Sequence, residues 1–207
     1  MKNFSIFLLL VLILCACNPE DSQTNSVPVI SINGSNETTV SLQGQYSEQG
    51  ATANDIEDGD ITSNIVISGS VNTQYADLYR IYYDVIDSDG NKAAQVTRNV
   101  KVKNDADYLD GYYNVSFQMT ASSGNGQPGT RIDKLESSKT ENNKVYIPQT
   151  NMIPSSKYLM VSNPNLQLIY TNNNINYNGT GVINSNTNFT LVYPWTWGTM
   201  NDVYVKQ

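Results

Sequence analysis

The sequence predicts an all-β protein with two units, residues 28–103 and residues 108–207. Short runs rich in Val, Ile and Tyr alternate with turn clusters of Gly, Asn, Ser and Thr. After the N-terminal segment, no apolar pattern with a helical period is long enough for a helix. The composition changes near residue 104, beyond which asparagine is abundant and both tryptophans occur. Short strands at this spacing, separated by turn clusters, are typical of β-sandwiches and small β-barrels.

Residues 1–16 are predicted to be a signal peptide. Lys2 supplies a positive charge, and residues 4–14 form an apolar run interrupted only by Ser5. A membrane-spanning helix needs about 20 apolar residues, so this run is too short to span and fits the apolar region of a secretory signal.

The run ends in "LCAC" (Leu14–Cys17), which resembles a bacterial lipobox. The resemblance implies cleavage after Ala16 and lipidation of Cys17, and therefore attachment to a membrane. Each buried methylene of an attached chain adds roughly 0.8 kcal/mol to membrane binding. Cys15 would leave with the signal peptide, so the mature chain would have one blocked cysteine and no disulfide.

Residues 17–27 form a polar, flexible tether in this interpretation. Glu20 and Asp21, soon after the lipidated cysteine, resemble the export tags of surface lipoproteins from glycan-foraging Gram-negative bacteria. The resemblance implies an outer-membrane, lipid-anchored protein exposed at the cell surface. The alternative is that the segment is only a solvated linker.

Charge and composition exclude several classes of function. The formal net charge is −7, with scattered Lys and Arg, whereas a nucleic-acid partner requires a basic surface. The chain contains no histidine, which excludes Ser–His and Cys–His catalysis and imidazole-ligated zinc.

In the first unit we expect strands at residues 29–32, 40–42 and 65–67, followed by a hairpin. In the hairpin, "RIYYDVID" and "VTRNVKVK" each alternate apolar and polar positions, and "DSDGNKA" joins them with turn residues. The alternation predicts that Tyr79, Ile81, Tyr83 and Val85 share one face of the strand.

Two blocks of this unit, "GATANDIEDGDIT" and "YRIYYDVIDSDGNKAAQVTRNVKV", resemble a bacterial immunoglobulin-like domain family. This family occurs in surface proteins and in some pesticidal crystal proteins. The resemblance covers nearly all of residues 28–103 and implies an Ig-like sandwich without catalytic residues, used for spacing or adhesion. The chain departs from the family at "YADLY" (Tyr75–Tyr79), where a Pro-Gly turn is usual.

"NDADYLD" (Asn104–Asp110) is a junction, and the second unit opens with "DGYYNV". The order of the two units, an Ig-like unit followed by an Asn- and Tyr-rich β-unit, resembles that of two-domain lipoproteins of gut-type Gram-negative bacteria whose activity is uncharacterised. Short strands predict a second sandwich or a small barrel. In each strand, apolar residues share one face: Tyr113, Val115, Phe117 and Met119; Leu166, Leu168 and Tyr170; Phe189, Leu191 and Tyr193; Val203 and Val205.

Two acidic loops are candidates for a calcium site, because calcium prefers six to eight oxygen ligands. The candidate ligands are Asp55, Glu57, Asp58, Asp60, Asp87 and Asp89. The spacing does not match an EF-hand loop. The alternative, which we favour, is that these residues only form tight turns, so that no cofactor is needed.

Arg98 is in register with Val96, Val100 and Val102, which places its side chain on the core side. A buried guanidinium needs a partner, and we expect Asp58 or Asp60 to provide it. The alternative is that Arg98 lies at the strand rim and extends to solvent.

"YPWTWGT" is the candidate ligand-binding stretch of the second unit. Alternation places Tyr193, Trp195 and Trp197 on one side, where flat rings could stack against sugars. The alternative is that these rings fill the core.

The leading hypothesis is a non-catalytic cell-surface lipoprotein. Its partners would be the membrane, through the lipid anchor, and a polysaccharide or outer-membrane uptake proteins, without nucleic acid. The second unit would bind a glycan or partner protein in an uptake or adhesion assembly. The alternative is a purely structural or adhesive spacer. The glutamates beyond residue 104, Glu136 and Glu141, lie in a segment predicted to be an exposed loop, so no glycosidase pair is evident.

Overall fold

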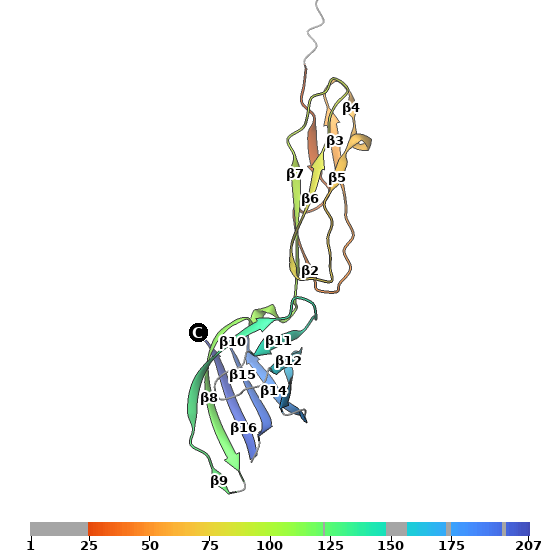
Figure 1. Ribbon diagram of the computed structural model, residues 1–207. Helices are drawn as coiled ribbons and strands as arrows, with labels where there is room; N and C mark the ends of the chain where they lie inside the picture. Colours follow the sequence, from red (N-terminus) through yellow and green to blue (C-terminus); the bar gives the residue numbers. More distant parts are fainter. Residues whose placement is uncertain (1–24, 122, 148–156, 173–174, 196–197) are drawn as a thin grey trace, which may run out of the picture.

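The computed structural model describes residues 25–121, 123–147, 157–172, 175–195 and 198–207 (Figure 1). Regular structure in these ranges consists of β-strands and two single-turn 3-10 helices, η1 (Thr62–Asn64) and η2 (Asp107–Leu109). The predicted all-β fold class is therefore confirmed. None of the helices in the described ranges has the length and apolar character needed to cross a membrane. The predicted signal peptide, Cys17 and most of the tether lie outside the described residues.

The first unit has two sheets that face each other across a small core. One sheet has the order β1-β3-β4 and the other β2-β7-β6-β5, with β2 parallel to β7. The strands are β1 (Val29–Ile32), β2 (Glu37–Ser41), β3 (Ala51–Asp55), β4 (Gly59–Asp60), β5 (Val66–Ser68), β6 (Asp77–Asp84) and β7 (Val96–Lys103). β6 and β7 pair antiparallel, as expected for the hairpin. Ile81, Tyr83 and Val85 are buried, which confirms the predicted alternation.

Arg98 of β7 is on the core side, as predicted, and only 2% of its surface is exposed. The prediction that Asp58 or Asp60 pairs with it is wrong. Asp58 instead accepts hydrogen bonds from the backbone and side chain of Ser88, and Asp60 accepts one from the backbone N–H of Thr62. Asp58 thus links its turn to the loop between β6 and β7, and Asp60 stabilises its own turn.

The partners of Arg98 come mainly from the backbone of distant loops. Its Nε lies 3.1 Å from Glu48 Oε1, and the guanidinium also donates to the hydroxyl of Tyr83. Three main-chain carbonyls accept its remaining hydrogen bonds: those of Asn33 at 2.8 Å, Ser35 at 2.5 Å and Gly50 at 3.1 Å. Arg98 thus ties the loop after β1 and the residue before β3 to the second sheet.

The second unit is a closed barrel of eight antiparallel strands, which decides between the two predicted architectures. Each strand pairs with the next in the chain, and β8 closes the ring by pairing with both β10 and β16. The strands are β8 (Gly111–Ala121), β10 (Gly129–Ser137), β11 (Lys144–Ile147), β12 (Lys157–Ser162), β13 (Asn165–Asn172), β14 (Ile175–Ser185), β15 (Asn188–Trp195) and β16 (Gly198–Lys206). The short β9 (Gly124–Asn125) pairs antiparallel with the last residues of β8.

Alternation along the strands places one set of side chains inside the barrel. Val203 and Val205 share a face, as expected, but this face is the outer one, with 41% and 45% of their surfaces exposed. Asp202 and Tyr204 point inward instead. Because the side-chain period of a strand is two, a shift of one residue exchanges its inner and outer faces.

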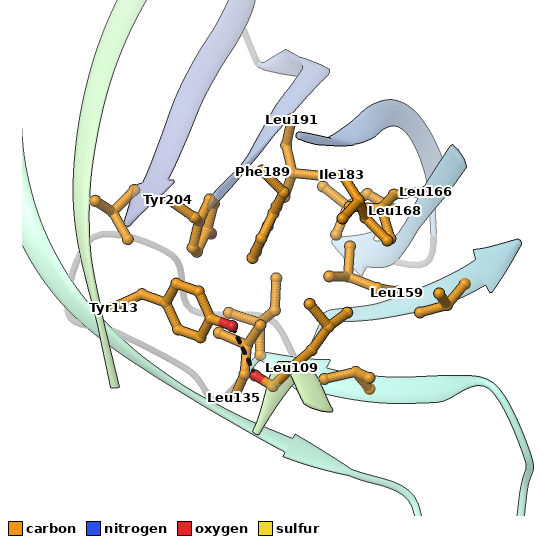
Figure 2. Packing of buried hydrophobic residues seen from close by; sticks show 14 of the residues in the cluster. Leu109, Tyr113, Leu135, Leu159, Leu166, Leu168, Ile183, Phe189, Leu191 and Tyr204 are labelled. Atoms are coloured by element: carbon orange, nitrogen blue, oxygen red, sulfur yellow. Dashed lines mark hydrogen bonds between the residues drawn. The ribbon is translucent and has the colours of Figure 1, made fainter. Parts of the chain in front are cut away.

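The end of the barrel near the first unit is filled by apolar side chains (Figure 2). The hydroxyl of Tyr113 donates to the carbonyl of Leu109, in η2, at 3.0 Å. The rings of Phe189 and Tyr204 stack with centroids 4.4 Å apart, and Tyr113 meets Phe189 edge-on at 5.3 Å. Leu135 completes this packing and is fully buried.

Asn104, which is buried, connects the two units. Its amide donates to the carbonyls of Ser138 and Glu141, each at 2.9 Å. Its side-chain oxygen accepts from the backbone N–H of Ala106 at 3.0 Å and that of Asn143 at 2.9 Å. The Asn104 side chain therefore holds the junction against the β10–β11 turn at the start of the barrel.

Two further hydrogen bonds join the units directly. The backbone N–H of Ala76 donates to the carbonyl of Lys139 at 2.8 Å, and the side chain of Gln43 donates to the carbonyl of Thr140 at 3.0 Å. The units lie end to end, with β9 at the far end of the barrel (Figure 1). The apolar end of the barrel thus faces the first unit, and the other end points away from it.

Candidate functional site

The barrel interior also contains charged and hydroxyl-bearing side chains where an apolar core would be ordinary. In β10, β12 and β15 they lie farther from the first unit than the buried leucine of the same strand. These inward-facing residues come from β10, β12, β15 and β16, and more than nine-tenths of each side chain is buried. We call this set the distal polar cluster: Arg131, Asp133, Lys157, Tyr193, Asp202 and Tyr204.

Arg131 organises the cluster, with 8% of its side chain exposed. Its Nε donates to both carboxylate oxygens of Asp133 at 3.0 Å, and Nη2 donates to Asp202 Oδ2 at 2.5 Å and to the Tyr204 hydroxyl at 2.9 Å. Its guanidinium carbon lies 5.5 Å from the ring centroid of Phe117. Burial acts to lower the pKa of Arg131, but Tyr204 and Asp202 outweigh it and raise this pKa.

Lys157, the first residue of β12, also points into the cluster. Its Nζ donates to the hydroxyl of Tyr193 at 3.3 Å and lies 4.4 Å from the centroid of that ring. The Tyr193 hydroxyl in turn donates to Asp202 Oδ2 at 2.9 Å. Burial lowers the pKa of Lys157 from 10.5 to about 7, although Asp202 acts in the other direction. Burial, then the charge of Asp202, raises the pKa of Tyr193.

The hydrogen bonding of the cluster is incomplete. The Asp202 carboxylate is fully buried, and its Oδ1 has no hydrogen-bond partner among the described residues. Lys157 Nζ, which has three donors, makes one hydrogen bond within the described part of the chain. An unsatisfied buried polar group is uncommon in native structures and needs an explanation.

The sequence-predicted stacking residues are only partly described. Tyr193 is buried, with 1% of its surface exposed, so its ring belongs to the interior and does not face solvent. For this residue the alternative interpretation, a ring in the core, is correct. Trp195 ends β15, but its side chain lies outside the described residues, as does Trp197. The stacking role of the two tryptophans stays a prediction.

The acidic loops of the first unit are held by turn hydrogen bonds. Asp55 Oδ1 accepts from the backbone N–H groups of Glu57 and Asp58, and Asp87 Oδ1 accepts from that of Asp89 at 3.0 Å. Within the described ranges, no group of three or more His, Cys, Asp or Glu side chains is placed to hold a metal ion. The geometry supports turn formation, which needs no metal.

Sequence reasoning missed the distal polar cluster, although its signal is present. In "TRIDKLES", Arg131 and Asp133 are in the same alternation as the buried Leu135. In "TMNDVYV", Asp202 is in register with Met200 and Tyr204. Charged residues in phase with core positions of a strand indicate a buried polar site.

Comparison with solved structures finds distant likenesses to three kinds of protein. The lipoprotein BT2262 from Bacteroides thetaiotaomicron is 16% identical, with a TM-score of 0.38, and the match covers 87% of this chain and 100% of that one. A redesigned β-barrel is 17% identical, with a TM-score of 0.32, over 49% of this chain and 94% of that one.

The third likeness is to the CBM51-2 and INT domains of Clostridium perfringens ZmpB, in complex with GlcNAc. They are 18% identical, with a TM-score of 0.30, over 86% of this chain and 44% of that one. No curated protein matches this chain in sequence. Residues 30–102 match the model of the family described as "Bacterial surface protein, Ig-like domain", which confirms the resemblance predicted for residues 28–103.

Proposed function

We propose that this protein is a non-catalytic, lipid-anchored protein of the outer membrane, exposed at the cell surface. In this proposal the Ig-like unit holds the barrel away from the membrane, and the far end of the barrel binds a glycan or a partner protein. The observation that carries the proposal is the distal polar cluster, a buried set of charged and hydroxyl-bearing side chains inside the barrel.

The path of the chain supports this arrangement. Asn25 accepts a hydrogen bond from Asn91, and Ser26 donates to Asp55 at 2.7 Å, so the described chain enters at the loops beside these residues. β7 runs from this end of the unit to Lys103, immediately before the junction with the barrel. A tether at residues 17–27 would therefore attach to the end of the Ig-like unit that is remote from the barrel.

The chemistry of the cluster supports binding over catalysis. Asp133 and Asp202 both pair with Arg131, so neither carboxylate is free to act as a general acid. Eight-stranded barrels can hold one small ligand in their interior.

The anchor is tested by Cys17→Ala in cells labelled with palmitate. We expect the unsubstituted protein to incorporate the label and to sediment with membranes, because lipidation requires the Cys17 thiol. The variant should do neither. If the variant is still labelled and still sediments with membranes, Cys17 is not the anchor.

The binding function is tested by presenting the purified mature protein, in detergent, to an array of polysaccharides. We expect saturable binding to at least one neutral polysaccharide. Lys101→Ala, an exposed change in the Ig-like unit, is the control and should bind equally well. Absence of binding to every polysaccharide would favour the spacer and contradict glycan capture.

A further inference from the structure

Asp202 carries a hydrogen-bond acceptor that the described fold leaves unused. Its Oδ2 receives hydrogen bonds from Arg131 and from the Tyr193 hydroxyl, whereas Oδ1 receives none from the described residues. None of the Asp202 side chain is exposed, so Oδ1 does not lie at the outer surface of the barrel. The free oxygen lies inside the barrel and needs a donor.

Lys157 supplies the complementary groups in the same cluster. Its Nζ and Asp202 Oδ2 both bind the hydroxyl of Tyr193, so the amine and the carboxylate are neighbours across one hydroxyl group. The amine has N–H donors that the described residues do not use. A spare acceptor and spare donors thus lie close together.

The charges around this point favour a neutral group. A ligand carboxylate would meet Asp202 and Asp133, and a ligand ammonium would meet Arg131 and Lys157. In a buried site such like-charge contacts are strongly unfavourable. A hydroxyl group avoids both, because it donates through its hydrogen and accepts through its oxygen.

Aromatic rings also lie near Lys157. Tyr170 and Tyr177 stack with their centroids 4.8 Å apart, and Lys157 Nζ lies 5.4 Å from the Tyr170 ring centroid. Tyr177 is only half-buried. Flat rings beside hydrogen-bonding groups are suited to ligands that have both apolar C–H faces and hydroxyl groups.

We infer that Lys157 and Asp202 bind a hydroxyl group of a neutral, polyhydroxylated ligand, a single sugar residue or a similar polyol. The hydroxyl donates to Asp202 Oδ1 and accepts from Lys157 Nζ. This inference rests on the proposed function, and it names the residues and the ligand class.

The test uses the purified mature protein with isotope-labelled lysine and NMR titration. The probes are glucose, galactose, mannose, N-acetylglucosamine and inositol, with glucuronic acid and glucosamine as charged counterparts. We expect at least one neutral probe to shift the Lys157 signal saturably, and the charged counterparts to bind at least about tenfold more weakly. Lys144, which packs outside the barrel 4.2 Å from the Tyr158 ring centroid, is the internal control and should not shift.

A variant adds a second readout. Lys157→Met keeps the length and apolar stem of the side chain, and should weaken binding of the neutral probe at least about tenfold. The matched Lys144→Met should bind like the unsubstituted protein. The NMR readout uses unsubstituted protein, so it decides the matter even where the Lys157 variant does not fold.

The outcomes separate this inference from the proposed function. Polysaccharide binding that is unchanged in folded Lys157→Met would overturn the inference and leave the proposed function standing. If neutral probes leave the Lys157 signal unmoved, the cluster holds only buried water and the inference is wrong. Absence of both polysaccharide and small-probe binding would contradict the inference and glycan capture together.

Discussion

Each unit of this protein buries one arginine on a strand, and the two arginines are used differently. Arg98 in the Ig-like unit donates mainly to main-chain carbonyls, and its one carboxylate partner, Glu48, has a side chain that is 24% exposed. Arg131 in the barrel pairs with Asp133 and Asp202, whose side chains are 1% and 0% exposed. The first arginine satisfies loops, whereas the second neutralises buried charge.

The difference between the two arginines indicates a structural role for Arg98 and a ligand-related role for the surroundings of Arg131. The hydrogen bonds around Arg98 join loops that the Ig-like sandwich must hold, and a structural role accounts for all of them. Around Arg131 the barrel retains an acceptor without a described partner, on Asp202, and a buried amine, on Lys157. Folding alone gives no reason for either group. A buried polar group without a described partner needs an explanation, and the inferred ligand supplies one for Asp202.

The largest expected effect comes from Arg131→Met. The change leaves two buried carboxylates without their cation and should destabilise the barrel by about 3–5 kcal/mol. Denaturant unfolding followed by the fluorescence of the two tryptophans, both in the second unit, measures the loss. Lys134→Met, an exposed change in the same strand, is the control and should alter stability little. Equal stabilities of the two variants would show that Arg131 does not hold the cluster together.

Arg98→Met should have a smaller effect, about 1–3 kcal/mol, confined to the Ig-like unit. The freed carbonyls of Asn33 and Ser35 belong to exposed residues, so water can replace the lost donors. Arg80→Met, on the neighbouring strand and exposed, is the control. The comparison between the two arginines would be wrong if Arg98→Met destabilised the protein more than Arg131→Met does.

Lys157 should make stability depend on pH. The pKa of Lys157 is about 7 in the folded protein and 10.5 in the unfolded chain, because burial disfavours the ammonium despite the nearby charge of Asp202. Between these values the unfolded chain binds more protons, so the free energy of unfolding rises with pH, by up to about 1.4 kcal/mol per pH unit. Below about pH 7 both states are protonated, and the cost of burying the charge is fully present.

Unfolding curves from pH 6 to 9.5 measure this slope. The charges that face Lys157 are Asp133, Asp202 and Arg131, and the hydroxyl that it binds is that of Tyr193. Lys157→Met removes the titrating group and should remove the rise between pH 7 and 9.5. A rise of equal size in the variant would assign the pH dependence to another group.

The smallest expected effect is that of calcium. Because Asp55 and Asp87 already accept backbone hydrogen bonds within their own turns, added calcium should leave the melting temperature of the protein unchanged relative to a chelator control. Thermal unfolding with and without calcium measures this. A rise in melting temperature that saturates with calcium would contradict the turn interpretation.

The sequence by itself determined the fold class and much of the local structure. Alternation predicted the β6–β7 hairpin and the inward side of Arg98, because a strand exposes alternate residues to opposite faces. Turn residues predicted where the acidic loops bend. These properties depend on neighbours within a few positions of the chain.

Tertiary structure decided which distant residues meet. The pairing of β16 with β8 closes the barrel and sets the face on which Asp202 lies, whereas the local pattern predicted only that Val203 and Val205 share a face. Arg131 and Asp202 are 71 residues apart in the chain, and Arg98 and Asn33 are 65 apart. Ring closure and loop packing, not local propensity, bring such pairs together, so the partners of both arginines and the distal polar cluster follow only from the folded structure.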